Sequence, residues 1–415
     1  MPHALSTPNR LRLMKITGRD GVLASQHLLE AIDEGVITGG GYTIPPQNVQ
    51  PASLDLRLGE TAYRVQCSFL PGAHQVERKL KDLIIDEFDL HKEGIVLEPM
   101  RPYLIPLKER LELPEYISAR ANPKSSTGRL DVFTRVITDG SYQFDDIRAG
   151  YVGGLYLEVV PLSFPIRVKE GLALNQLRLS VGQPTMRDEE IQAIHQETPI
   201  LFTGDGVPFS KEDLPLDNGL FLSLDLQGGR SRRVGYRARD TAPLLDMTKT
   251  SREDPDRYWE PVNSEGDHII LKQERFYLLM SNEAVAIPPG IASEMTAYDP
   301  TNGELRTHYA GFFDPGFGYD QAETFHGSKA ALEVRAHDVS FMIDHGQRVC
   351  KLTFEKMLEP PLMLYGYSGR SSYQQQLGPL GKHFSQPAAV PTAPEAAIVP
   401  AVRDENQLEL PIDAD

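Results

Sequence analysis

The chain has 415 residues, and its 42 Lys and Arg against 58 Asp and Glu side chains give 42 − 58 = −16 formal charges at pH 7. This charge argues against nucleic acid and membranes as partners, because both attract a surplus of cationic side chains. With 40% hydrophobic and 24% charged residues the composition is typical of a soluble globular protein, and the length exceeds one average core, so we expect two domains.

The sequence lacks the signals of secretion and of cysteine chemistry. No apolar run approaches the roughly 18 residues of a membrane-spanning helix, and residues 1–21 carry no secretory apolar segment, so we expect a cytoplasmic protein. The only two cysteines, Cys67 and Cys350, exclude a disulfide framework and a cysteine-rich zinc site. The histidines form no HxH or HExxH motif and no HxE followed by PCxxC, so we predict no protein-held metal and no zinc-dependent deamination.

One clear helix near the start and many short strands are predicted along the chain. The helix runs from Ser25 to Gly35, with Ser25 as N-cap, Leu28, Leu29 and Ile32 on one face, and Gly35 as its stop. Beyond it, apolar runs partly alternate with polar residues, as in VLEPMRPYLIPLKERLEL, GGLYLEVVPL, PIRVKEGLALNQLRLSV and HIILKQERFYLLMSNEAVAI. Proline and glycine interrupt these runs at intervals of roughly 8–12 residues, which is typical of short strands in a β-barrel or sandwich.

Three strings recur at nearly one offset, which indicates an internal duplication. SLD at 53–55 returns 170 residues later, LPEYISA returns 174 residues later as IPPGIAS, and LEV at 157–159 returns 175 residues later. The predicted segments are an N-terminal extension (1–19), a first β domain (20–185), a charged connecting segment (186–214), a second β domain (215–360), a C-terminal segment (361–383) and a disordered Ala/Pro-rich tail (384–415).

Four segments carry residues that could take part in chemistry. The turn NPKSSTGR at 122–129 offers backbone N–H groups, hydroxyls and two cations to a polyphosphate, although solvated surface turns share this composition. DPG at 314–316 indicates a hairpin in which the small Ala310 and Gly311 would let a flat ligand approach the backbone, with a plain β-turn as the alternative. Glu333 in AALEV and Glu158 in LYLEV are each either a half-buried proton shuttle with a raised pKa or an ordinary solvent-facing strand residue.

Five motifs follow one another along the chain: PASLDLRLG at 51–59, KSSTGR at 124–129, AGFFDPGFG at 310–318, LEV at 332–334, and Tyr365 followed by YQQQLGP at 373–379. In this order they resemble the deoxycytidine triphosphate deaminases, a family that shares its fold with the trimeric deoxyuridine triphosphatases. The resemblance covers about residues 20–383 in two tandem copies. It implies a mainly β fold of two tandem dUTPase-like β-barrel or jelly-roll domains with a few short helices.

The resemblance also implies an activity and a set of site residues. The activity is zinc-independent hydrolysis of dCTP to dUTP and ammonia, with Mg²⁺ arriving on the substrate triphosphate. Catalytic roles are implied for Ser125, Arg129 and one of two glutamates, Glu333 or Glu158. Substrate binding is implied for Lys124, Ser126, Asp55, Ala310, Gly311, Asp314, Tyr365, Tyr373 and Gln376. Lys124 stands where the family has an arginine, so it keeps the charge without the bidentate fork.

The two copies depart from the family pattern in complementary ways. The first keeps KSSTGR but reads TRVITDGSYQFDDIRAGYVGG where AGxxDPG is expected. The second keeps AGFFDPGFG but reads TAYDPTNGEL where the paired serines and the arginine are expected. In this fold class the phosphate motif of one subunit faces the hairpin of its neighbour. We therefore predict one composite site per chain, closed by the C-terminal segment and built from Lys124, Ser125, Ser126, Arg129, Ala310, Gly311, Asp314 and Glu333.

Other functions stay open at this point. A deoxyuridine triphosphatase, or a bifunctional enzyme that forms the monophosphate, would use Asp314 to orient the attacking water, and an inactive nucleotide-binding regulator would keep only the fold. The glutamate in LEV favours deamination, because base chemistry needs a proton shuttle beside the ring. The expected ligands are dCTP and dUTP. Binding of dTTP, a second degenerate pocket, and the choice between a monomer, a dimer and a trimer of tandem chains stay open.

Overall fold

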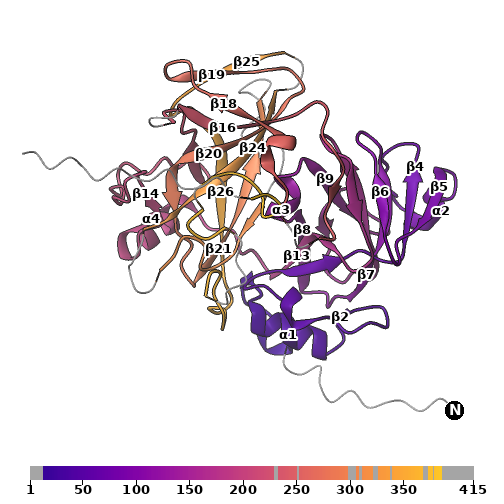
Figure 1. Ribbon diagram of the computed structural model, residues 1–415. Helices are drawn as coiled ribbons and strands as arrows, with labels where there is room; N and C mark the ends of the chain where they lie inside the picture. Colours follow the sequence, from indigo (N-terminus) through magenta and orange to yellow (C-terminus); the bar gives the residue numbers. More distant parts are fainter. Residues whose placement is uncertain are drawn as a thin grey trace, which may run out of the picture. The chain divides into compact units, whose positions relative to one another are not determined.

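Mainly antiparallel strands form two sets of sheets with a similar plan (Figure 1). The computed structural model describes residues 13–228, 232–249, 252–297, 305–307, 311–320, 326–336, 339–367, 373–376 and 378–385. Residues 1–385 form one unit and residues 386–415 another, and every element described below belongs to the first unit.

The first set comprises two sheets. One contains, in order, β1 (Gly21–Val22), β13 (Ala173–Val181), β8 (Ile117–Pro123) and β10 (Asp146–Ile147), with β3 (Leu54–Arg57) also on β13. The other contains β5 (Ile84–Asp89), β4 (Thr61–Val65), β7 (Tyr103–Glu112), β11 (Val152–Pro161) and β9 (Val132–Ile137), with β2 (Ile37–Thr38) also on β7. A small third sheet joins β6 (Ile95–Leu97), β12 (Ile166–Val168) and β17 (Leu245–Asp246).

The second set repeats the two larger sheets, with four strands where the first of them has five. One contains β15 (Leu220–Ser223), β26 (Arg348–Lys356), β21 (Ile291–Ala297) and β23 (Gly311–Phe313). The other contains β18 (Trp259–Asn263), β16 (Arg233–Ala238), β20 (Phe276–Val285), β24 (Ser328–Ala336) and β22 (Leu305–Thr307), with β14 (Leu201–Phe202) also on β20, and β19 (His268–Leu271) pairs with β25 (Phe341–Asp344). The prediction of two tandem, mainly β domains is confirmed. We call the elements from β1 to β13 the first repeat and those from α4 to β26 the second repeat.

The helices in the described part of the chain are few and short. They are η1 (Leu13–Ile16), α1 (Ser25–Asp33), η2 (Pro46–Asn48), α2 (Val76–Leu80), α3 (Ser125–Gly128), α4 (Asp188–Glu197) and η4 (Pro255–Arg257). The predicted helix near the start is present as α1, but Ala24 and not Ser25 is its N-cap, and Leu29 is 44% exposed whereas Leu28 is buried. No described helix is long and apolar enough to cross a membrane.

Two further expectations are revised by the fold. The predicted connecting segment 186–214 carries α4 and β14 and keeps its place in the prediction. The segment 311–318 turns at Asp314, where the N–H of Phe317 donates to the Asp314 carbonyl at 3.1 Å, but it is no simple hairpin, because β23 and β24 belong to different sheets. Phe384 lies in the segment predicted to be a disordered tail, yet it is fully buried; residues 386–415 lie outside the described residues.

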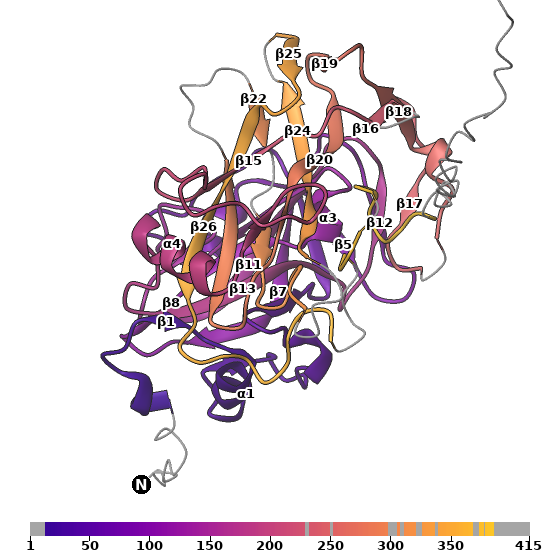
Figure 2. The same cartoon turned by 90° about the vertical axis from the view of Figure 1, so that its left-hand side faces the viewer.

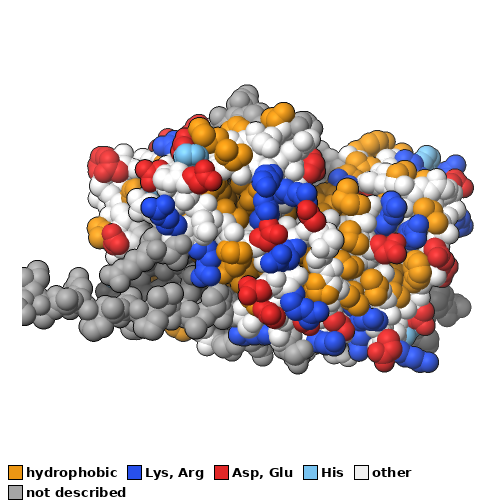
Figure 3. All heavy atoms as spheres, turned by 45° about the horizontal axis from the view of Figure 1, so that its top comes forward, with side chains coloured by type: hydrophobic (Ala, Val, Ile, Leu, Met, Phe, Trp, Pro, Cys, Tyr) orange, Lys and Arg blue, Asp and Glu red, His pale blue; other side chains and the backbone are white. Residues whose placement is uncertain are grey.

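The hydrophobic core of the first repeat continues into the second. Tyr258, Trp259 and Phe276 of the second repeat belong to the same buried cluster as Phe164 of the first, and the ring of Phe164 packs edge-on against Tyr258 and Trp259. On the face drawn in Figure 3, basic and acidic side chains are interspersed. Viewed from the two directions of Figures 1 and 2, α3 of the first repeat lies beside the strands of the second.

Candidate active site

A cavity of about 420 Å³ is lined by both repeats and by the C-terminal segment. The first repeat contributes Gln47, Gln50, Asp55, Pro123, Lys124, Ser125, Ser126, Gly128, Arg129 and Gln176. The second contributes Met295, Gly311, Phe312, Phe313, Asp314, Phe317, Ala330, Ala331 and Glu333, and the C-terminal segment contributes Tyr365, Tyr373, Gln376 and Lys382. Most of the site residues predicted from the sequence thus line a single cavity. Ala310 lies outside the described residues.

The turn after β8 supplies cations and hydroxyls to one end of the cavity. Lys124 has an extended backbone and precedes the single helical turn α3, which begins at Ser125. The Lys124 ammonium pairs with one oxygen of the Asp55 carboxylate, while the other Asp55 oxygen is buried and has no partner among the described residues. Burial raises the pKa of Asp55, and the Lys124 cation opposes this effect. This end of the cavity can bind a polyanion through cations, or hold a hydrated cation at Asp55.

Glu333 and Arg129 bring the two repeats together at the other wall. A Cβ atom added to Gly128 of α3 would lie 2.6 Å from Oε2 of Glu333, so only glycine lets the turn approach the carboxyl this closely. Burial raises the pKa of Glu333 to about 8, Arg129 opposes the rise and Asp131 adds to it. A carboxyl that titrates near neutral pH can both accept and release a proton, as a proton shuttle requires.

The Arg129 guanidinium is held by the C-terminal segment. It stacks on the ring of Tyr373 with 3.7 Å between its central carbon and the ring centroid, and its Nη1 donates to the Pro379 carbonyl at 3.2 Å. Its Nε is buried and has no hydrogen-bond partner among the described residues. A stacked, buried arginine with a free donor is well placed to bind an anionic or carbonyl oxygen in the cavity.

The segment that follows β23 is fixed by Asp314. Its Oδ1 accepts from Arg178 at 3.0 Å, and its Oδ2 accepts from the Ser53 hydroxyl at 3.2 Å, both residues belonging to the first repeat. Asp314 therefore docks this segment onto the first repeat with both of its oxygens engaged. At Gly311 an added Cβ would meet no atom within 4 Å, so the backbone there faces open space on the cavity side.

The C-terminal segment crosses the cavity and binds to the same turn. The Gln374 side chain accepts from the N–H of Gly318 at 3.0 Å and donates to the carbonyl of Gly316 at 3.1 Å. Gln376 donates to the Lys329 carbonyl at 2.6 Å. Tyr365 packs against Phe317 with 5.8 Å between ring centroids. These contacts hold the described parts of the segment against the second repeat beside the cavity.

Sequence reasoning missed Lys382, which lines the cavity and lies near the end of the C-terminal segment, in the stretch 378–385. Burial lowers the pKa of Lys382, the nearby Lys124 cation lowers it further, and Asp55 opposes both effects. The N–H of Lys382 donates to the Tyr373 hydroxyl at 3.2 Å, and Phe384 anchors the chain by packing against Tyr258 and Trp259 at centroid distances of 5.2 and 5.9 Å. A lone lysine six residues beyond Gln376 belongs to no motif, so the sequence carried no signal for it.

Glu158 does not line this cavity. Its carboxylate is 2% exposed and accepts from Nη2 of Arg135 at 2.6 Å, on the neighbouring strand of the first repeat. The strand position is the counterpart of Glu333, but an arginine of the same repeat already pairs with this carboxylate. The geometry therefore separates the two glutamates that the sequence left as alternatives.

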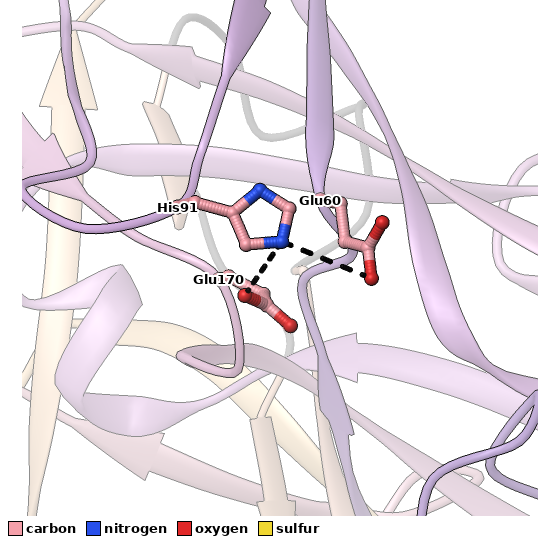
Figure 4. A group of neighbouring side chains, drawn as sticks. All are labelled: Glu60, His91 and Glu170. Carbon is pink, nitrogen blue, oxygen red and sulfur yellow. Dashed lines mark ion pairs between the residues drawn. The ribbon is translucent and has the colours of Figure 1, made fainter.

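A second group of polar side chains lies in the first repeat (Figure 4). Ligand atoms of Glu60, His91 and Glu170 lie within 4.8 Å of one another, and Nε2 of His91 is 3.4 Å from Glu170 and 3.9 Å from Glu60. Lys108 already pairs with Glu170, and a hydrogen bond from the ring to Asp89 raises the pKa of His91. The hydrogen bond between His91 and Asp89 and the ion pair between Lys108 and Glu170 account for this surface group.

Replacing Glu333 by glutamine is expected to stabilise the fold increasingly as the pH rises from about 4.5 to about 8. The folded state raises the pKa of Glu333, so as the pH rises the carboxyl ionises first in the unfolded state. The wild-type protein therefore loses stability between these two pH values, and it loses no stability below the lower one. Urea unfolding of both proteins on each side of the window measures the effect, which we expect to be a few kcal/mol. Glu260→Gln is the control: the hydrogen bond from Arg237 lowers the pKa of Glu260, so its glutamine variant should not gain stability. A gain for Glu333→Gln that is independent of pH would contradict the prediction.

Comparison with known proteins matches the whole of this architecture. Two family models fit consecutive parts of the chain: the 2'-deoxycytidine 5'-triphosphate deaminase (DCD) N-terminal domain over residues 19–183, and its C-terminal domain over residues 187–384. The crystal structure of 2'-deoxycytidine 5'-triphosphate deaminase from Agrobacterium tumefaciens is similar, with 43% sequence identity and a TM-score of 0.75 over 82% of this chain and 99% of that chain.

Shorter relatives align with part of the chain only. A dCTP deaminase of Natronomonas pharaonis is 30% identical over 158 residues, which is 38% of this chain and 78% of the relative. A protein of Persephonella marina named dCTP deaminase, dUMP-forming, is 29% identical over 133 residues, which is 31% of this chain and 67% of the relative. Each alignment is no longer than a single repeat.

Proposed function

The chain belongs to the 2'-deoxycytidine 5'-triphosphate deaminase family, and from this membership and the cavity we propose that it hydrolyses dCTP to dUTP and ammonia at one composite site per chain. The observation that carries the proposal is the approach of Gly128 and Arg129 of the first repeat to the Glu333 carboxyl of the second. The phosphate turn, residues 124–129, belongs to the first repeat. The glutamate strand, which is β24 with Glu333, belongs to the second, and both line a single cavity.

The distribution of charge in the cavity favours one orientation of the nucleotide. The triphosphate binds at the end that carries Lys124, Lys382 and the hydroxyls of the α3 turn, because this end offers cations and donors. The cytosine ring lies between Glu333 and Gly311, where the absence of a Cβ leaves room for a flat ring. Mg²⁺ would arrive with the triphosphate, and the Asp55 oxygen that has no partner among the described residues would accept from its water shell.

Hydrolysis needs a proton acceptor beside the C4 atom of the base, and Glu333 is that acceptor. Water adds to C4 while the Glu333 carboxylate takes one of its protons and passes it to N3 of the ring. Glu333 then carries the remaining proton of the added hydroxyl to the amino nitrogen, so that the C4–N bond breaks, ammonia leaves and C4 becomes a carbonyl. Ser125 and a backbone carbonyl of the 311–318 turn position the water, and Arg129 stabilises the ionised glutamate and the developing charge.

A second candidate function is a deaminase that also releases pyrophosphate and forms dUMP. The Persephonella relative, which is named dUMP-forming, supports this candidate. Both oxygens of Asp314 are already bound by the first repeat, which weighs against Asp314 as the residue that orients a water at the phosphates. Incubation with dCTP and Mg²⁺, followed by nucleotide chromatography and an ammonia assay, tests the proposal. Ammonia with dUTP supports it, ammonia with dUMP and pyrophosphate supports the second candidate, and tight binding without ammonia overturns both.

Replacing Lys382 by alanine is expected to raise the KM for dCTP by about tenfold and to leave kcat nearly unchanged, because a charge-assisted hydrogen bond to the phosphates is lost. Initial rates over a range of dCTP concentrations measure both constants. The control is Lys356→Ala, which removes a lysine that pairs with Glu190 away from the cavity. An unchanged KM for Lys382→Ala would remove Lys382 from the binding site.

A further inference from the structure

Behind the cavity wall, an ion pair that no motif indicates joins the two repeats. Nη2 of Arg335 contacts Oδ2 of Asp131, and the two side chains are 9% and 0% exposed. Asp131 follows Arg129 by two positions after α3, and Arg335 follows Glu333 by two positions on β24. Neither residue lines the cavity. The pair therefore lies directly behind the two side chains to which we assign the chemistry.

Side chains point alternately to the two faces of a strand, and this explains why the pair acts on Glu333. Side chains two positions apart on a strand point to the same face, so Glu333 and Arg335 both project toward the α3 turn. Glu333 meets Gly128 there, and Arg335 meets Asp131. Arg335 is held from its other side, where Nη1 donates to the Glu274 carbonyl.

Asp131 is in turn fixed to the α3 turn. Its N–H donates to the Gly128 carbonyl at 2.8 Å, and its own carbonyl accepts from the N–H of Leu162 at 2.9 Å. Its φ is +58°, a left-handed conformation that costs energy for any residue except glycine and that persists only where neighbours enforce it. Its Oδ2 also accepts from the Ser163 hydroxyl. Asp131 thus connects Arg335 to the α3 turn through its ion pair and its backbone hydrogen bond.

We propose that the Asp131–Arg335 pair is a clamp between the repeats that seats the α3 turn on β24 and so holds Arg129 and Gly128 at the Glu333 carboxyl. The two residues are positioning residues, because they act through Arg129 and Glu333 and reach no substrate. Charged and titratable groups that face Glu333 are Arg129 and Asp131 from the first repeat and Tyr373 from the C-terminal segment. Among them Asp131 raises the pKa of Glu333, so loss of its charge should lower that pKa.

The kinetic arm of the test rests on the proposed function. Asp131→Asn keeps the size of the side chain and an acceptor for Ser163, but removes the charge. We expect kcat to fall by about 10²-fold, the loss typical of a displaced catalytic group, while KM changes little. Glu294→Gln is the matched control, because it breaks another ion pair between the repeats, with Arg120, and adds or removes no charge beside Glu333. It should leave kcat unchanged.

The second arm does not depend on the reaction. Carboxyl ¹³C NMR of the nucleotide-free protein, with Glu333→Gln to assign the resonance, follows the titration of Glu333. We expect this titration to stay in place in Glu294→Gln and to move to lower pH in Asp131→Asn, where a nearby negative charge is lost. Arg335→Lys keeps the cation but loosens the clamp, so displacement of Arg129 should move its titration to higher pH and reduce kcat, and this variant decides the matter if the asparagine variant does not fold. If the wild type releases no ammonia, the proposed function fails while the two titration shifts still decide the clamp.

Two outcomes would overturn the clamp. One is a folded Asp131→Asn protein with wild-type kcat and a wild-type Glu333 titration. The other is an equal loss of kcat in Glu294→Gln, which would mean that any weakening of the contact between the repeats has this effect.

Discussion

Replacing Glu333 by glutamine is expected to reduce ammonia release from dCTP by about 10²–10⁴-fold, the range that general acid–base catalysis contributes. Glutamine keeps the size and the polarity of the side chain but cannot take the proton of the attacking water. Because Glu333 touches the α3 turn from the wall of the cavity, dCTP should still bind. Single-turnover ammonia release and equilibrium binding of dCTP separate the two effects.

Glu158→Gln is the matched control for this experiment, since it makes the same change at the corresponding position of the first repeat. Its carboxylate pairs with Arg135 and lies away from the cavity, so ammonia release should stay near the wild-type rate. If only Glu158→Gln abolished the reaction, the assignment of the catalytic glutamate to the second repeat would be wrong.

Replacing Arg129 by methionine is expected to lower kcat by about 10²–10³-fold, as does the loss of one preorganised donor in other active sites. The variant loses the cation that opposes the rise in the Glu333 pKa, so the acid limb of the pH–rate profile should also move to higher pH. Arg129→Lys keeps the charge but loses the planar group that stacks on Tyr373, and it should recover part of the activity. Rates measured across the pH range test both statements.

The control for Arg129 is Arg237→Met, which removes an arginine paired with Glu260 at a distance from the cavity. It should leave the pH–rate profile unchanged. A wild-type kcat and a wild-type profile in Arg129→Met would exclude Arg129 from the chemistry and leave it as a residue that binds the C-terminal segment.

The duplicated fold could be predicted from the sequence because its signals are local. The alternation of apolar and polar residues marks strands one at a time, and SLD and LEV recur at nearly one offset. The same holds for the phosphate turn, whose lysine, serines and arginine are neighbours in the chain. Where a local rule failed, the cause was a competing local contact: Ala24 caps α1 because His27 accepts its N–H at 3.2 Å, which leaves Ser25 inside the helix.

The residues that the sequence could not reveal depend on contacts between distant segments. Lys382 reaches the cavity only because Phe384 is anchored among the aromatic rings of the second repeat. Asp131 and Arg335 are 204 positions apart and look like ordinary surface charges in the sequence. The 311–318 turn was predicted as a hairpin, since no local rule indicates that β23 and β24 enter different sheets.

Complementary losses in the two repeats gain a physical meaning in this arrangement. The proposed site needs one phosphate turn and one glutamate strand. The corresponding turn of the second repeat and the corresponding strand of the first therefore need not keep the residues that bind and convert the nucleotide. In the first repeat the buried carboxylate of Glu158 pairs with the partly exposed Arg135, which is a structural role. The proposal therefore predicts that the first repeat's glutamate can be replaced by any partner that satisfies this arginine.

The crystal structure of Glu333→Gln with dCTP and Mg²⁺ tests the composite site most directly. We predict a single nucleotide per chain, with its C4 amino group beside the substituted side chain on β24 of the second repeat and its phosphates at Lys124 and Ser125 of the first. A nucleotide bound entirely by one repeat, or one whose base and phosphates contact different chains, would contradict the account.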